Sequence, residues 1–140
     1  MTLPAIMQSQ YWPIQQIPGI SRPQLNQLAK FGVTTTSELL HYCQQPNQRR
    51  QLSQSLSISI RDINKWIAMS DLARIPNVGW QYCGLLLHAG IGSVSQLATM
   101  PVQQVHKQIQ RLQVQHLQRA DLCPNRGQVA EWIQSAQRLR

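Results

Sequence analysis

Apolar residues recur at helical spacing along the whole chain, and no segment alternates with the period of two that a half-buried strand requires. The first clear helix is predicted from about Pro23 to Phe31, with Leu25 and Leu28 on its apolar face. Proline is favoured in a first helical turn because its missing N–H needs no partner there. Gly32 is predicted to end this helix in the left-handed conformation. The pattern as a whole predicts an all-α fold.

A second helix is predicted to start directly after this stop. Thr35 has the side chain of an N-cap, and Glu38 lies three residues later, where it can reach back to form a capping box. The same order of signals returns further along, with Gly90 as the stop and Ser93 and Gln96 as the box. Two independent occurrences of stop and box predict two similar helical turns.

The remaining apolar spacing predicts four more helices. They are Pro46 to Leu56; a helix capped by Ser57 or Ser59 that carries Ile63, Trp66 and Ile67; a helix from Pro101 that carries Val102, Val105, Ile109 and Leu112; and, after a break at Pro124-Asn125, a helix that carries Val129, Trp132, Ile133 and Ala136.

The chain contains an internal repeat, which decides how these helices are grouped. Residues 17–40 align without a gap on residues 75–98, at a constant offset of 58, with six identities in 24 positions. The segment around Trp66 similarly matches the segment around Trp132 at an offset of 66. We therefore expect one domain, 1–140, with an N-terminal extension at 1–13 and two half-units at 14–70 and 71–139.

The start of each half-unit carries a short motif. Residues 17–21 read IPGIS and residues 75–79 read IPNVG, and each is followed by a predicted helix and a Gly-Val or Gly-Ile turn. These segments resemble the helix-hairpin-helix motif, hPGhG. Two copies resemble the tandem helix-hairpin-helix proteins of DNA repair and recombination. The resemblance implies two half-units related by a pseudo-two-fold axis, and here each is followed by a spacer helix and a Trp-containing helix.

A longer match narrows the resemblance. The run 71–79, with Trp66 before it and Trp132 near the end, is similar to a bacterial family of unknown function that is frequent in cyanobacteria. The resemblance covers the chain from about Ile14 to Leu139, and the family implies no reaction.

Phosphate capture is the physical reason for such a hairpin. A tight glycine turn can direct successive N–H groups outward, and the next helix adds the positive end of its dipole. The resemblance implies that two hairpins grip both strands of a duplex across a minor groove. Both copies depart from the motif, because Ser21 replaces the second glycine of the first and Asn77 replaces the first glycine of the second. Gly19 and Gly79 are retained.

Further candidate contacts follow the hairpins. Arg22 and Lys30 are the basic residues near the first hairpin, and the second is followed by Trp80 and Gln81. Trp80 has two interpretations, as a stacking platform for a base or as a packing residue between the halves. Four further basic residues have two interpretations, as the extension of a phosphate track or as solvated polar faces: Arg49, Arg50, Lys107 and Arg111.

Charge favours a polyanionic partner. The net charge is +8, divided equally between residues 1–70 and 71–140, so any basic surface must be assembled by folding. Scattered glutamines, 23 in all, make polar helix surfaces without charge. Cys43, Cys83 and Cys123 are far apart, which, with no signal peptide or membrane-spanning run, predicts free thiols and a cytoplasmic location.

No catalytic constellation is visible. The chain has five acidic residues, without a recognisable acid–base spacing, and no metal or nucleotide motif, so we expect no enzyme and no cofactor. The first hypothesis is a module that binds duplex DNA, or structured RNA, without strong sequence preference. The alternative is a helical adaptor that binds other proteins. An exposed apolar patch around Trp12, Trp80 or Trp132 would favour the adaptor.

Overall fold

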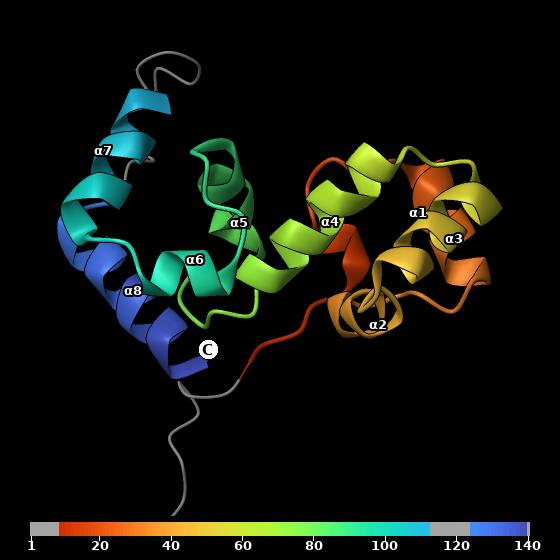
Figure 1. Ribbon diagram of the computed structural model, residues 1–140, viewed down its shortest axis with the longest axis horizontal. Helices are drawn as coiled ribbons and strands as arrows, with labels where there is room; N and C mark the ends of the chain where they lie inside the picture. The colour runs from red at the N-terminus through yellow and green to blue at the C-terminus, as the bar shows by residue number, and fades with distance from the viewer. Residues whose placement is uncertain (1–8, 113–123, 140) are drawn as a thin grey trace, which may run out of the picture.

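The computed structural model describes residues 9–112 and 124–139, and within these residues the fold is all-α, with no strand. Figure 1 shows two groups of helices joined by the long helix α4. In order, the elements are η2 (Ile14–Gln16), α1 (Arg22–Lys30), α2 (Thr36–Tyr42), α3 (Pro46–Leu56), α4 (Ile60–Leu72), α5 (Gly79–His88), α6 (Val94–Ala98), α7 (Val102–Leu112) and α8 (Arg126–Leu139).

Local signals set the helix boundaries as predicted. Gly32 and Gly90 follow α1 and α5 with φ of +87° and +96°, in the left-handed region that glycine favours. Thr35 caps α2, and its hydroxyl accepts from the N–H of Glu38 at 3.1 Å. The Glu38 carboxylate accepts in return from residues 34 and 35, and these hydrogen bonds lower its pKa.

The structure decides between two predicted caps of α4 and changes one detail of the predicted start of α6. Of the two serines proposed to cap α4, Ser59 is the N-cap, whereas Ser57 ends α3 with a φ of +53°. Ser93 caps α6 as predicted, but the Gln96 side chain accepts from the N–H of Gly92 rather than from that of Ser93. The Gln96 side chain also donates from Nε2 to the Gly90 carbonyl at 3.1 Å, so it closes the turn that precedes the helix.

The two halves share a packing scheme. In the first, α4 packs against α2 and α3; in the second, α8 packs against α6 and α7. Trp66 and Trp132, at the centres of α4 and α8, are 2% and 1% exposed. Helix α4 also packs against α5 and leads directly into the second hairpin. It therefore belongs to the cores of both halves.

Residues from the expected N-terminal extension tie the two halves together. The Trp12 N–H donates to Oγ1 of Thr36 at 3.0 Å in the first half. The Trp12 indole Nε1–H donates to the Ala73 carbonyl at 2.8 Å in the second. The N–H of Gln10 donates to the Arg74 carbonyl at 2.9 Å. Residues 9–13 thus form a strap between the halves, while residues 1–8 lie outside the described part.

The thiols and acids occupy structural positions. Cys43 and Cys83 are buried and free, and burial raises the pKa of Cys83 to about 11, so its thiol stays protonated at neutral pH. Asp71 pairs with Arg74 at 2.9 Å and also accepts from the N–H of Val94 at 2.8 Å. Cys123 lies outside the described residues.

One buried hydroxyl lacks a partner, which gives a stability prediction. Ser70 on α4 is 0% exposed, and its Oγ makes no hydrogen bond within the described residues. Ala136, 66 residues later, is equally buried without a hydroxyl. We expect Ser70→Ala to leave the free energy of unfolding unchanged or raise it by up to about 1 kcal/mol, because an unsatisfied polar group is removed.

Urea unfolding followed by circular dichroism measures this change. Thr36→Val is the matched control, because Thr36 is also 0% exposed but its Oγ1 accepts a hydrogen bond from Trp12. This control should lose about 1–2 kcal/mol. An equal loss in Ser70→Ala would show that the Ser70 hydroxyl is satisfied in solution.

Candidate nucleic-acid interface

The first hairpin presents its turn to solvent. Ile17, 2% exposed, anchors it in the core, and Gly19 is exposed with a φ of +88°. No atom lies within 4 Å of the position that a Cβ on Gly19 would occupy. The backbone N–H groups of Gly19 and Arg22 have no partner within the described residues. The turn therefore offers two free donors beside the exposed Arg22 side chain.

The N-terminus of α1, which follows this hairpin, is capped by side chains of its own first turn. The Ser21 hydroxyl accepts from the N–H of Gln24 at 3.3 Å, and the Gln24 side chain accepts from the N–H of Ser21 at 2.9 Å. Pro23, between them, has no N–H to offer. Ser21, expected to bind phosphate in place of a glycine, thus has its hydroxyl engaged as an N-cap.

The second hairpin has the opposite character. Gly79 has a φ of +57° and is buried, and its N–H donates to the Ile75 carbonyl at 3.0 Å. The Trp12 ring lies 3.3 Å from the position of a Cβ on Gly79 and covers this side of the turn. The Asn77 carbonyl accepts from Nε1 of Trp132 at 3.0 Å. The turn itself is therefore locked into the core by two tryptophans.

The start of α5, in contrast, is open. Val78 precedes it without a side-chain cap. The N–H groups of Asn77, Trp80 and Gln81 have no partner in the described part of the chain. Gln81 is exposed and Trp80 is half-buried. Trp80 and Gln81 lie in the first turn of a ten-residue helix, where an anion is favoured.

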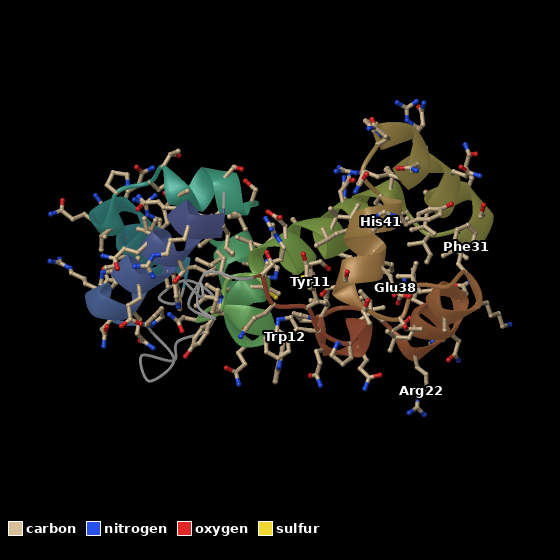
Figure 2. All side chains as sticks on the ribbon, turned by 90° about the horizontal axis from the view of Figure 1, so that it is seen from below. Tyr11, Trp12, Arg22, Phe31, Glu38 and His41 are labelled. Carbon is tan, nitrogen blue, oxygen red and sulfur yellow. The ribbon has the colours of Figure 1, made fainter. Side chains whose placement is uncertain are left out.

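The two hairpins lie close together. The Pro18 ring, in the first hairpin, lies 3.2 Å from the position that a Cβ on Gly84 of α5 would occupy. Gly84 is little more than one turn along the helix that begins at the second hairpin. In Figure 2, Arg22 projects from the side of the molecule on which Trp12 also lies. We call this side, with residues 17–22 and 75–81, the hairpin face.

Other predicted contacts do not extend this face. Arg49 is half-buried, and its Nε–H donates to the Cys43 carbonyl at 3.1 Å. Arg50 is exposed on α3, whereas Lys107 and Arg111 are exposed on α7. Figure 1 places α3 and α7 at opposite ends of the molecule, so these residues form no continuous track. Lys30 is exposed at the far end of α1.

Sequence reasoning missed two determinants of the hairpin face. Trp12 precedes the repeat, and nothing in its neighbours signals that it would pack on Gly79. Gly84 did carry a signal, because a glycine inside an apolar helix often marks a close approach of another backbone or ring. Pro18 is the group that approaches it.

The described residues contain no group of three or more His, Cys, Asp or Glu residues able to hold a metal ion. None of the helices described is long and apolar enough to cross a membrane.

Comparison with known proteins identifies the family of the chain. No curated protein and no solved structure matches it significantly. A family model does match, over residues 18–139, which takes in both hairpins and both Trp-containing helices. The chain therefore belongs to the family described as "Domain of unknown function (DUF4332)".

Proposed function

We propose that the protein binds the phosphate backbone of nucleic acid through the hairpin face, as a tandem helix-hairpin-helix module that catalyses no reaction. The observation that carries the proposal is the packing of the first hairpin against α5, the helix that begins at the second hairpin, together with backbone N–H groups at both hairpins that no described residue engages. Backbone donors bind phosphate oxygens without reading bases. Duplex DNA is the first choice of ligand, and structured RNA the second.

The two hairpins contribute differently. At the second, a phosphate would sit on the open N-terminus of α5 and accept from the N–H groups of Trp80 and Gln81. At the first, Gly19 offers a turn amide, and the Arg22 side chain adds a full charge. Arg74, near the second hairpin, is already paired with Asp71.

The distribution of apolar side chains supports this proposal over the adaptor. Trp132 is 1% exposed, and Trp12 is packed on Gly79. Among the described residues, the large apolar side chains classed as exposed are Tyr11 and Ile60. An adaptor would need an exposed apolar patch around the tryptophans. Trp12 and Trp132 do not contribute to such a patch, because both are packed against other residues.

Fluorescence-anisotropy titrations against duplex DNA, single-stranded DNA and structured RNA, each at several salt concentrations, test the proposal. With Arg22 as the charged contact of the hairpin face, log K for duplex DNA should fall against log[salt] with a slope of about −1. Arg22→Ala should weaken binding to all duplex sequences alike and reduce the slope by about one. Trp80→Ala should weaken binding further if the indole stacks on a base or sugar.

Arg138→Ala is the matched control, because Arg138 is an exposed arginine on α8 and belongs to neither hairpin. Its slope should equal that of the wild type. Absence of binding even at low salt would reject the proposal and leave the hairpins with a purely structural role. Equal losses for Arg22→Ala and Arg138→Ala would show attraction to net charge rather than to the hairpin face.

A further inference from the structure

A second polar concavity lies outside the hairpin face. A groove of about 460 Å³ lies between the C-terminal end of α5 and the surface of α7. Its polar lining residues are His88, Gln104, Lys107, Gln108 and Arg111, and no carboxylate is among the residues that line it. We call it the α5–α7 groove.

Helix geometry fixes the basic side of this groove. Gln104, Lys107, Gln108 and Arg111 follow the spacing i, i+3, i+4 and i+7, which places them on one face of α7. The other face carries Val105 and Ile109, both 0% exposed. Because this apolar face is buried, α7 cannot rotate to turn its basic stripe away from the groove.

One hydrogen bond joins the two walls of the groove, α7 and the C-terminal end of α5. Nε2 of Gln108 donates to the Ala89 carbonyl at 2.8 Å. The same Nε2 lies 3.4 Å from the position that a Cβ on Gly90 would occupy, so the glycine allows this close approach. Lys107 precedes Gln108, and His88 precedes Ala89. The bond therefore holds a lysine and a histidine on opposite walls.

The positive charge of the groove has no counter-charge within the described residues. Neither Lys107 nor Arg111 makes an ion pair there, whereas Arg74 is paired with Asp71. The two cations are one helical turn apart, about 5–6 Å between Cβ atoms. We infer that the α5–α7 groove is a phosphate-binding site, separate from the hairpins, for a ligand with at least two phosphate groups.

The ligand class follows from this donor set. Lysine and arginine bind phosphate oxygens through charge-assisted hydrogen bonds, and Gln104 adds a neutral donor. The volume lies in the range of pockets that hold small molecules, so a polyphosphate compound would fit. Neighbouring phosphates of a nucleic-acid strand offer the same chemistry.

A structural role for the cations makes a different prediction. Basic side chains stabilise the C-terminal ends of helices, and Arg111 lies in the last turn of α7. In that role, removal of Lys107 and Arg111 would lower the melting temperature without affecting ligand binding.

The test is a titration of the ¹⁵N-labelled full chain with inorganic pyrophosphate and, separately, with a single-stranded thymidine oligonucleotide, followed by NMR. Saturable shifts are expected at the backbone amides of Ala89 and Gln108, which flank the groove. The double variant Lys107→Gln/Arg111→Gln should weaken this binding at least about tenfold, since two charge-assisted contacts are lost. The ligand that binds more tightly identifies the source of the phosphate.

Arg61→Gln/Lys65→Gln is the matched control. It removes the same two residue types at the same spacing from an exposed face of α4 and should bind like the wild type. Equal weakening in both double variants would overturn the site in favour of net charge. Absence of saturable shifts with either ligand would overturn it outright. Because the readout is local to Ala89 and Gln108, failure here leaves the hairpin titrations unaffected.

Discussion

Trp132→Ala is expected to lower the free energy of unfolding by about 3–5 kcal/mol, because it empties a large volume at the centre of the second half. Trp132 is 1% exposed on α8. Its ring lies against Tyr82 of α5, with ring centroids 5.1 Å apart, and its indole N–H donates to the Asn77 carbonyl. One side chain thus joins the last helix, the helix after the second hairpin, and the hairpin itself.

Trp132→Phe separates the two contributions. Phenylalanine keeps much of the ring volume but cannot donate to Asn77, so its loss should be clearly smaller, about 1–3 kcal/mol. Urea unfolding followed by circular dichroism is the appropriate measurement, because both variants remove a fluorophore. If Trp132→Ala lost less than Trp132→Phe, or less than about 1 kcal/mol, α8 would not be docked on the second hairpin as described.

Gly79→Ala should lower the free energy of unfolding by about 1–3 kcal/mol, and by more than Gly19→Ala. Both glycines have positive φ, +57° and +88°, so both substitutions carry backbone strain. A Cβ on Gly19 would enter open space, whereas one on Gly79 would meet the Trp12 ring at 3.3 Å. That ring cannot easily move away, since its Nε1–H is bound to the Ala73 carbonyl at 2.8 Å.

A double-mutant cycle with Trp12→Leu isolates the steric part of this effect. A smaller side chain at position 12 should relieve the contact, so Gly79→Ala should cost less in the Trp12→Leu background than in the wild type. The strain from φ should persist in both backgrounds. Additive losses would show that Trp12 and Gly79 are not in contact, and the strap would then lie elsewhere.

Substitution of the same two glycines should also have different effects on nucleic-acid affinity. Gly19→Ala changes the exposed turn in which the Gly19 N–H is free, and Gly79→Ala changes a turn whose own N–H is already bound to Ile75. Gly19→Ala should therefore reduce nucleic-acid affinity with a modest loss of stability. Gly79→Ala should affect affinity mainly through the position of α5.

The binding role of the candidate residues stays a prediction. Sequence reasoning about the site reached as far as the exposure of single segments: Gly19, Arg22 and Gln81 are exposed at the hairpins, as contact with phosphate would require. It was incomplete for Ser21, because a hydroxyl in that position can either approach a ligand or cap the next helix, and Gln24 decides for the cap. It could not place Arg49, whose engagement with Cys43 depends on how α2 and α3 meet.

The sequence alone determined the helices, most of their starts and stops, and the faces that they bury. Each of these depends on interactions within a few residues, such as the Thr35 cap, the Gly32 turn or the spacing of Leu25 and Leu28. The repeat likewise follows from residue-by-residue similarity.

Only the tertiary structure decided which surfaces these helices share. Pro18 on Gly84, Trp12 on Gly79 and Trp132 on Asn77 join residues that are 55 to 67 positions apart along the chain. No local pattern encodes such contacts, because they depend on which side chains fill the space between helices once all of them have packed. The same packing puts α3, which carries Arg50, and α7, which carries Lys107, at opposite ends of the molecule (Figure 1).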